Sequence, residues 1–455
     1  MSVELDTIAA IATAPGPAAL AVVRVSGRRA GEILNALLGQ AAAPPVRAPT
    51  LRELQDPANG EVLDQAVVTW YQAPASYTGE DLVEISCHGG RLVPALVLDA
   101  CLASGARMAE PGEFTRRAYL NGKLDLVQAE AVADLVDAHS RRLHRAAMGQ
   151  LERGLSERVA ALRAALIHVE ALLAHHIDFP EEDDAPVPVE SVAEEGKGVL
   201  RQLEVLLATA PEGTLLREGA VVVLAGRPNT GKSSLYNALL GEERAIVTEE
   251  PGTTRDALEA MVQMGGFPFR LVDTAGLRAA EGRVEKLGVE VARRYLARAD
   301  VVLLCVDVGT GVGEAETEFL GELGSRPIVR VDTKGDLGGD ALEDGEGCYA
   351  GRVRVSVVTG EGLGELRDLL PRLVFRGLVG SAPDVPVVTR RRQARALAAA
   401  RDEVGAFVGA LDSGVPAEMA TTHLRAAETA LEEVVGAVSV GEILDAVFKE
   451  FCIGK

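Results

Sequence analysis

Gly226-Arg-Pro-Asn-Thr-Gly-Lys-Ser-Ser234 lies in the middle of the chain, after the apolar run 221–225 and before the amphipathic stretch 235–240. This order predicts a strand, a phosphate-binding loop and a helix. The spacing G-x-x-x-x-G-K-S places backbone N–H groups around a β-phosphate, the Lys232 ammonium against the β/γ oxygens and the Ser233 hydroxyl on Mg²⁺. A glycine-rich turn without a ligand is the alternative, and the motifs that follow argue against it.

Two motifs typical of nucleotide switches come next. Gly252-Thr-Thr-Arg-Asp256 offers Thr254 for switch I, because its hydroxyl can bind Mg²⁺ while its N–H meets the γ-phosphate. After a further predicted strand comes Asp273-Thr-Ala-Gly276, in which Asp273 would bind Mg²⁺ through water. The Gly276 N–H would contact the γ-phosphate. The order of these motifs predicts a nucleotide-dependent switch.

The base-recognition motif favours guanine. A predicted buried strand ends in Asp332-Thr-Lys-Gly-Asp336, and the Asp336 carboxylate can accept hydrogen bonds from guanine N1–H and N2–H₂, which adenine does not offer. Ser356-Val-Val358 would close over the base. Thr333 stands where most GTPases have Asn and Val357 where Ala is usual, which bears on affinity more than on base identity. Five loops in this order predict a Ras-like α/β P-loop G domain.

The residues expected to contact GTP therefore come from these five loops: Asn229, Thr230, Gly231, Lys232, Ser233, Ser234, Thr248, Glu249, Glu250, Pro251, Gly252, Thr253, Thr254, Asp273, Thr274, Ala275, Gly276, Thr333, Lys334, Gly335, Asp336, Ser356, Val357 and Val358.

GTP hydrolysis requires a group that orients the attacking water, and the position that usually supplies this group does not do so here. Ras-like proteins orient the attacking water with a Gln after the D-x-x-G motif, where this chain has Leu277. The Asn229 side chain near the β/γ bridge can ligate a monovalent cation, which would supply the charge of an arginine finger. Arg255 and Arg278 are in-chain alternatives for that charge.

Composition indicates the cellular compartment of the protein and limits how it could bind RNA. With 455 residues the chain has room for about three domains. Five scattered cysteines without a C-x-x-C pair suggest a reducing compartment. The apolar stretch 8–23 follows acidic residues and contains Pro15-Gly16-Pro17, so we expect a cytoplasmic protein without membrane insertion. The net charge of −21 means that an RNA partner would need a local basic surface. Two arginine runs, 390–392 with Arg395 and 141–142 with Arg145, either provide one or are solvated helix faces.

The rest of the chain predicts an α+β N-terminal domain and an α-helical bundle. Residues 1–120 alternate strand-like runs with glycine turns and place Arg24 and Glu84 on strands. From 125 onward a capping box and helical spacing predict one helix, or two nearly continuous ones, of about fifty residues. Further helices are predicted at 190–207, 390–411, 416–435 and 440–451. One bundle interrupted by the G domain is favoured over two separate helical modules.

The chain resembles the MnmE (TrmE) family of tRNA-modification GTPases essentially end to end. The matching stretches are Asp6-Thr-Ile8, Thr78-Gly-Glu-Asp81, His88-Gly-Gly90, Pro111-Gly-Glu-Phe114, Asn121-Gly-Lys-Leu-Asp125, Ile177-Asp-Phe-Pro180, 226–234, 252–256, 273–278 and Phe451-Cys-Ile-Gly-Lys455.

This resemblance implies three domains: a formyl-tetrahydrofolate-binding and dimerising domain at 1–121, a helical domain at 122–217 and 378–455, and a G domain at 218–377. It implies a homodimer that hydrolyses GTP with K⁺ stimulation. In a heterotetramer with the FAD-dependent protein MnmG, it would add a carboxymethylaminomethyl-type group to carbon 5 of the wobble uridine of certain tRNAs. A GTP-dependent RNA-binding switch in ribosome assembly is the alternative function.

Carried over by position, the family's site residues fall into four groups. Glu285 would act on the attacking water through a second water, and Ser233 and Thr254 would hold Mg²⁺. The K⁺ ligands would be Asn229, Thr248, Glu250 and Thr253, and the 5-formyltetrahydrofolate or related folate would meet Arg24, Glu84, Lys123 and Lys455. Only seven of the 46 basic residues are Lys, and four of those seven fall in proposed ligand sites. Cys452 lies in the C-terminal motif without an adjacent base, so a chemical role for it stays open.

Overall fold

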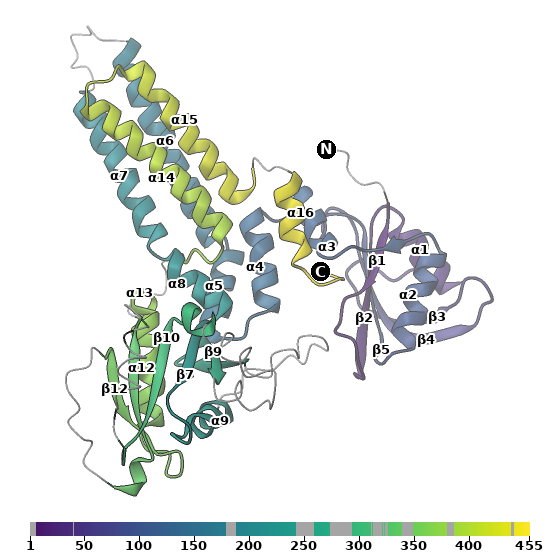
Figure 1. Ribbon diagram of the computed structural model, residues 1–455. Helices are drawn as coiled ribbons and strands as arrows, with labels where there is room; N and C mark the ends of the chain where they lie inside the picture. Colours follow the sequence, from purple (N-terminus) through teal and green to yellow (C-terminus); the bar gives the residue numbers. More distant parts are fainter. Residues whose placement is uncertain are drawn as a thin grey trace. The chain divides into compact units, whose positions relative to one another are not determined.

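The computed structural model describes residues 6–39, 41–178, 188–242, 259–273, 294–310, 312, 321, 323, 326–338, 349–379, 386–437 and 441–455. The chain divides into two compact units, of which the first combines Met1–Ala133, Leu151–Ser156 and Glu432–Lys455. The second combines Asp134–Gln150 and Glu157–Leu431. Each unit is thus assembled from segments far apart in the sequence, which are coloured by residue number in Figure 1.

The first unit contains a six-stranded sheet in the order β3-β4-β5-β2-β1-β6. Its strands are β1 Ile8–Ile11, β2 Leu20–Ser26, β3 Thr50–Gln55, β4 Val62–Tyr71, β5 Leu82–His88 and β6 Arg107–Met108. Helices α1 Ala30–Leu38 and α2 Val93–Ala103 pack on one face and share its apolar core. Arg24 and Glu84 lie opposite each other on the paired strands β2 and β5. Alternation along both strands sends these two side chains away from that core.

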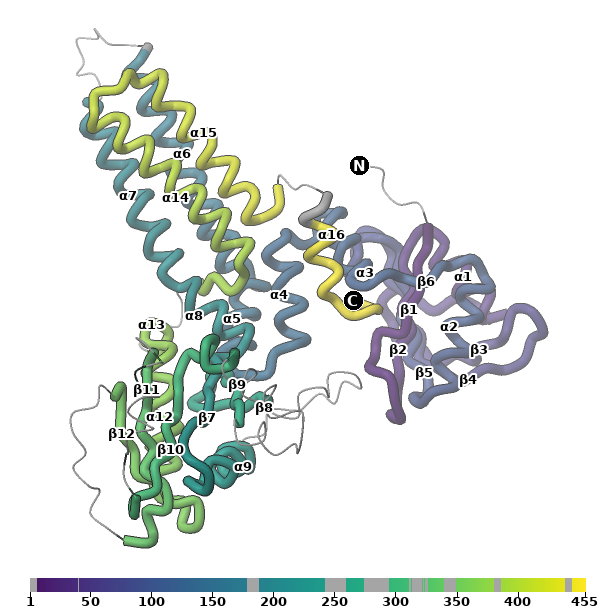
Figure 2. The backbone as a smooth tube through the Cα atoms, viewed as in Figure 1, coloured from purple at the N-terminus to yellow at the C-terminus, as the bar shows by residue number. Residues whose placement is uncertain are grey.

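The C-terminal end of the chain belongs to the same unit. The last helix of the chain is α16 Gly441–Lys449, and this unit also contains α3 Glu113–Leu120 and most of α4 Leu126–Val136. Leu444 and Phe448 of α16 share one apolar cluster with Leu126 of α4. Beyond α16, Ile453 forms a β-bridge with Pro111. The tube in Figure 2 shows this yellow segment ending beside β1 and β2.

The long helix expected after 125 is wrong, because the structure has three helices there. The predicted capping box does start α4: the Gln128 N–H donates to Asp125 Oδ1 (2.8 Å) and the Asp125 N–H to Gln128 Oε1 (3.1 Å). The helix ends at 136, and α5 Arg141–Leu151 starts anew after Ser140, whose Oγ accepts the Leu143 N–H. Arg153, at φ +72°, then separates α5 from α6 Gly154–Asp178. Capping and left-handed backbone override the apolar periodicity.

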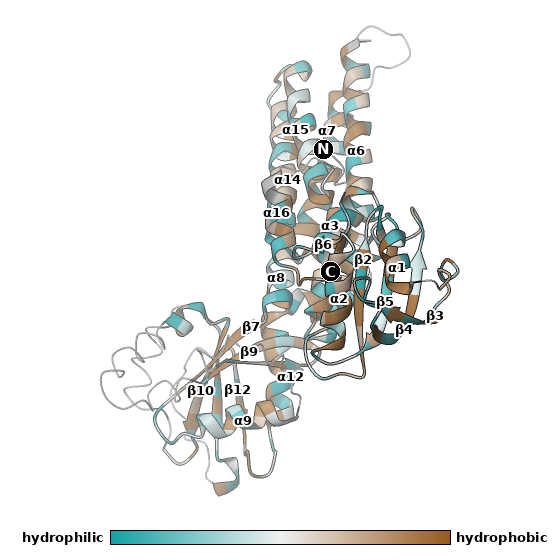
Figure 3. Ribbon diagram, turned by 90° about the vertical axis from the view of Figure 1, so that its right-hand side faces the viewer, coloured by the Kyte–Doolittle hydropathy of each residue, from teal (hydrophilic) through white to brown (hydrophobic). Residues whose placement is uncertain are grey.

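Helices of the second unit form a bundle beside the G domain. In Figures 1 and 3 α6, α7, α14 and α15 run alongside one another. Their bounds, with α8, are α7 Val189–Leu207, α8 Ala210–Glu218, α14 Arg391–Asp412 and α15 Ala417–Val435. Segment 154–177 of α6 is long and apolar enough to cross a membrane by length and composition, with 22% of it buried. That is weak support for a membrane span, because core helices of soluble proteins pass the same test.

The G domain contains a second six-stranded sheet, in the order β12-β11-β10-β7-β9-β8. The strands are β7 Ala220–Ala225, β8 Glu259–Met264, β9 Phe267–Asp273, β10 Val301–Asp307, β11 Ile328–Thr333 and β12 Gly351–Arg354. All neighbouring pairs are parallel except β8 with β9. This confirms the predicted α/β class, and Figure 3 shows apolar colours along β7 and β9.

Buried apolar clusters cover both faces of this sheet. One includes residues of α9 Lys232–Glu242 and α12 Leu363–Val374. Leu143 of α5 and Leu216 of α8 belong to the same cluster, although both were predicted in the helical domain. Because the strands β7, β9, β10, β11 and β12 are parallel, the loops that follow them meet at one edge of the sheet.

Candidate nucleotide-binding and folate-type sites

The phosphate loop connects β7 to the first residue of α9. Its first glycine, Gly226, has φ +138°, and an added Cβ would lie 2.4 Å from the Cys305 carbonyl oxygen, so only glycine fits. The buried Lys232 ammonium donates to the carbonyl oxygens of Gly226 (3.0 Å) and Arg227 (2.5 Å). The Lys232 side chain therefore contacts its own loop, which is the loop predicted to surround the phosphates of the nucleotide.

The two described groups predicted for Mg²⁺ lie together. The Ser233 hydroxyl, in the first turn of α9, donates to Asp273 Oδ2 at the end of β9 over 2.7 Å. A hydroxyl and a carboxylate are the oxygen ligands that Mg²⁺ favours. Asp273 is 7% exposed, so its carboxylate is largely shielded from water. The donor set fits Mg²⁺, because the Ser233 hydroxyl and the adjacent Asp273 carboxylate are both oxygen donors.

The base-recognition residues also converge. Ser356 Oγ donates to Asp336 Oδ1 over 2.7 Å, which orients the carboxylate expected to read guanine. Lys334 has φ +59°, and the Gly335 N–H donates to the Val355 carbonyl oxygen (3.1 Å). The two loops predicted around the base are thus connected to each other. Val357 and Val358 follow in the second loop as exposed residues.

Thr333 has a structural role that the sequence pattern did not reveal. Its buried Oγ1 lies 2.7 Å from the Thr230 carbonyl oxygen and 3.1 Å from that of Val306. Thr230 is in the phosphate loop and Val306 in β10. Because a hydroxyl carries one hydrogen, it donates to one carbonyl at a time or shares it. Thr333 thereby fastens the base-recognition loop to the phosphate loop in place of the usual Asn.

Sequence reasoning missed Asp307, the last residue of β10. The Lys334 ammonium lies 2.6 Å from Asp307 Oδ2, and the Gly309 N–H donates to Oδ1 (2.9 Å). These contacts, the lysine first, lower the pKa of the Asp307 carboxyl. The signal was available, because an acid at the carboxyl end of the apolar run Val301–Asp307 falls at the loop edge of a parallel sheet.

The remaining predicted groups lie outside the described residues. For GTP, K⁺ and hydrolysis these are Thr248, Glu249, Glu250, Pro251, Gly252, Thr253, Thr254, Thr274, Ala275, Gly276 and Glu285. Of the predicted K⁺ ligands only Asn229 is described, as an exposed residue with φ +62° in the phosphate loop.

The predicted folate residues Arg24 and Glu84 form an ion pair. Arg24 Nη2 lies 2.7 Å from Glu84 Oε1, and its Nη1 donates to the Gly454 carbonyl oxygen at 3.4 Å. The guanidinium also lies 5.6 Å from the centroids of the Tyr77 and Phe114 rings. Lys455 follows Gly454 in the chain, so the backbone that carries Lys455 reaches the Arg24–Glu84 pair.

Lys123, the fourth predicted folate residue, contacts the loop that carries Tyr77. Its ammonium donates to the Pro74 carbonyl oxygen over 3.1 Å. The Asn121 amide reaches the same loop and donates to the Thr78 carbonyl oxygen over 2.7 Å. The loop before β5 therefore links Lys123 to the ring that lies against Arg24.

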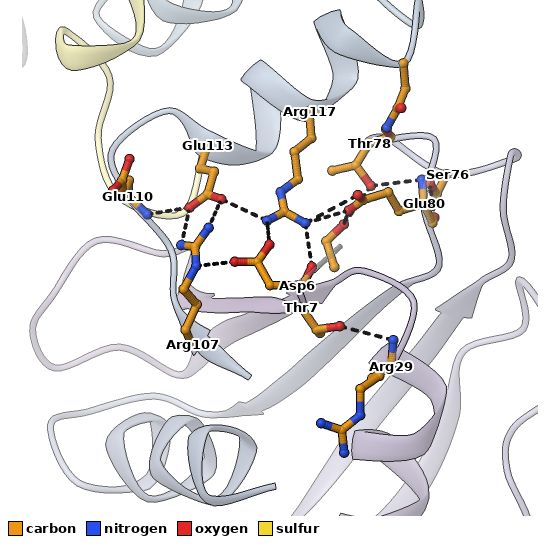
Figure 4. Close-up of polar contacts among 12 residues, drawn as sticks. Asp6, Thr7, Arg29, Ser76, Thr78, Glu80, Arg107, Glu110, Glu113 and Arg117 are labelled. Atoms are coloured by element: carbon orange, nitrogen blue, oxygen red, sulfur yellow. Dashed lines mark hydrogen bonds and ion pairs between the residues drawn. The ribbon is translucent and has the colours of Figure 1, made fainter. Parts of the chain in front are cut away.

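A charge network around the buried Arg117 and Glu113, drawn in Figure 4, connects several segments of this unit. Arg117 pairs with Asp6 (2.8 Å), Glu80 (3.2 Å) and Glu113 (2.9 Å), and Arg107 pairs with Glu113 (2.6 Å) and Asp6 (2.5 Å). Burial would raise the pKa of Glu113, but hydrogen bonds, that from Arg107 first, outweigh burial and lower it. Sequence motifs flagged several of these residues without indicating that they form one network.

Comparison with known proteins identifies the family. Residues 7–123 match the model "GTP-binding protein TrmE N-terminus" and residues 126–452 match "MnmE helical domain". The chain is 41% identical to the tRNA modification GTPase MnmE of Moorella thermoacetica, over 99% of each chain. It is 43% identical to that of an Azoarcus species over 99% of this chain and 98% of the relative. By both measures this chain belongs to the MnmE family of tRNA modification GTPases.

Proposed function

We propose that this protein hydrolyses GTP in a K⁺-stimulated reaction that serves modification of the wobble uridine of tRNA. A tRNA-modifying GTPase is the part of this function that family membership supports directly. The observation that carries the assignment is the convergence of Lys232, the Ser233–Asp273 pair and the Ser356–Asp336 pair at one sheet edge. These groups account in turn for phosphate, metal and guanine.

Each described residue then has a chemical task. The Lys232 ammonium leaves the loop carbonyls to meet the β/γ-phosphates, and the N-terminus of α9 adds its dipole. Ser233 and Asp273 would hold the metal, and Asp336 would select guanine. Bound Mg²⁺ neutralises charge on the phosphate oxygens. Leu277 offers no group to orient water, so Glu285 acting through a second water is the base we propose.

Asn229 is the residue on which the K⁺ proposal depends. Its left-handed backbone places it on the exposed side of the phosphate loop. With Thr248, Glu250 and Thr253 it would hold K⁺ beside the β/γ bridge and stabilise the charge that develops there. GTP turnover should rise strongly when K⁺ replaces Na⁺, and Asn229→Ala should remove that difference. Equal rates of the unchanged protein in both salts would sink the cation role.

We infer further that the first unit binds a formyl-tetrahydrofolate and mediates homodimerisation. Arg24, Glu84, Lys123 and Lys455 would contact the folate, and the Tyr77 ring beside Arg24 suits a planar heterocycle. Titration calorimetry with 5-formyltetrahydrofolate tests this, with Arg24→Ala expected to abolish binding. Unchanged folate affinity in that variant would remove the site from the proposal.

Modification requires a partner in this proposal. Together with the flavoprotein MnmG, the protein would add a carboxymethylaminomethyl-type group to carbon 5 of the wobble uridine, in the cytoplasm where tRNA matures. Nucleoside analysis of tRNA from cells lacking this protein should show an unmodified wobble uridine. A normal profile would instead favour the GTP-dependent RNA-binding switch. Reconstitution with and without MnmG then locates the covalent step.

A further inference from the structure

Helix α5 carries positive charge where helix stability favours negative charge. Its first turn contains Arg141 and Arg142 and no acidic residue, and Arg145 follows one turn later. The N-terminal turn of a helix has a positive dipole end, which favours Asp or Glu. The chain has 67 acidic and 46 basic residues, so acids are abundant. Arginines at a helix N-terminus in such an acidic chain reduce helix stability, which indicates that they serve a function.

The exposed side of α5 is available to a ligand. Arg141, His144 and Arg145 are exposed, and the spacing of Arg141 and Arg145 places them on one face of the helix. Within the described parts of the chain, neither arginine forms an ion pair. The other arginine run is used internally instead: Arg390 pairs with the buried Asp134 (2.6 Å) and Arg391 with Glu218 (3.2 Å).

The opposite side of α5 holds the hairpin that connects the two predicted switches. The Arg142 N–H donates to the Gly266 carbonyl oxygen (3.1 Å), and the Arg142 guanidinium lies 5.0 Å from the Phe267 ring centroid. The Arg141 N–H donates to Gln263 Oε1 (3.1 Å), and Leu143 belongs to the core of the G domain. Strands β8 and β9 of this hairpin follow switch I and end at Asp273. A ligand on α5 would therefore lie on a helix in direct contact with the segment between the switches.

We propose that the exposed side of α5, formed by Arg141, His144 and Arg145, binds backbone phosphates of the tRNA. This inference rests on the proposed function, which supplies the RNA. Guanidinium groups bind phosphate through two parallel hydrogen bonds. The net charge of −21 repels RNA at long range, so the protein needs such a local cluster to bind it.

The test is tRNA binding by the full-length protein, measured by fluorescence anisotropy with an unmodified tRNA transcript at several salt concentrations. Arg141→Glu/Arg145→Glu should weaken binding at least about tenfold, and Arg141→Ala/Arg145→Ala should lower the salt slope by about 2. Arg28→Glu/Arg201→Glu makes the same charge change at two exposed arginines outside both arginine runs and should leave affinity within about twofold. GDP affinity, unchanged in all variants, confirms that each one folds.

Three results would overturn the inference. Equal tRNA affinity in the α5 and control variants would exclude this surface. Loss of MnmG binding with tRNA binding intact would assign the helix to an acidic protein surface. An unchanged protein that binds no tRNA would also exclude it, while the wobble-uridine profile of cells lacking the protein decides the proposed function separately.

Discussion

The nucleotide-binding loops and the proposed folate site of this protein are built in opposite ways. Each described group at the nucleotide site sits in a short motif at the end of a parallel strand, and the strand order brings the motifs together. At the folate-type site, Arg24 meets the Gly454 carbonyl oxygen across 430 positions of sequence. Chemistry in the first case depends on local backbone geometry. In the second it depends on the folding of a whole unit, including its buried charge network.

The largest expected effect separates activity from stability. Lys232→Ala should lower kcat/KM for GTP about a thousandfold, because the charge that stabilises the γ-phosphate transition state is lost. Folate binding and the urea midpoint of the first unit should not move. Lys197→Ala, at a partly exposed lysine of α7 paired with Glu194 and Asp412, is the matched control and should turn over GTP as the unchanged protein does. A parallel loss of folate binding in Lys232→Ala would mean that the two sites are not independent.

A substitution in the charge network should instead impair the proposed folate site by destabilising the first unit. Arg117→Met removes the guanidinium cation from the half-buried Glu80 and from the buried Glu113, which keeps Arg107 as a partner. The loss should cost the first unit about 3 kcal/mol of unfolding free energy, the low end for breaking a buried ion pair. Trp70, the single tryptophan, reports on this unit by fluorescence during urea unfolding. Arg29→Met breaks only an exposed pair with Glu32 and should cost less than about 1 kcal/mol. GDP affinity that falls as much as stability in Arg117→Met would contradict the separation.

A smaller effect is expected at Thr333. Thr333→Val keeps the shape and removes the hydroxyl that joins the base-recognition and phosphate loops, leaving a buried carbonyl unsatisfied. The cost is about 1 to 2 kcal/mol, or roughly five- to thirtyfold in GTP affinity, with kcat nearly unchanged. Fluorescent-nucleotide titration measures it. Thr333→Ser retains the hydroxyl and should bind within about threefold of the unchanged protein; equal losses in both variants would point to packing.

Acid should affect the first unit through the charge network. The folded-state pKa of Glu113 lies below its ordinary 4.5, so its contribution to stability is full above that pH. It is lost as the pH falls through the lowered folded-state pKa. The urea midpoint reported by Trp70 should therefore drop below about pH 4.5, and less steeply in Arg117→Met. Equal acid sensitivity of both proteins would exclude Arg117 as a cause of the lowered pKa and leave it to the other partners of Glu113, Arg107 first.

Sequence motifs located the loops of the G domain at the ends of strands because each motif fixes its own backbone. The residues Ser233, Asp273, Asp336 and Ser356 were each expected in such loops, whereas the hydrogen bonds that join them in pairs come from the structure. The predicted helix after 125 failed because periodicity does not register the cap at Ser140 or the left-handed Arg153. Asp307 and the Arg107–Glu113–Arg117 network were missed because their partners come from other segments. Such contacts are set by tertiary packing, which single-sequence patterns do not encode.

The contact between Arg24 and Gly454 also sets an order in time. The arginine leaves the ribosome long before its last neighbour, since 430 positions separate them. At about 5 to 20 residues per second, this delay is roughly 20 to 90 seconds. While the G domain is synthesised, Arg24 therefore lacks the carbonyl group that it contacts in the folded unit. Any ligand that needs this contact would bind only after the G domain has been translated.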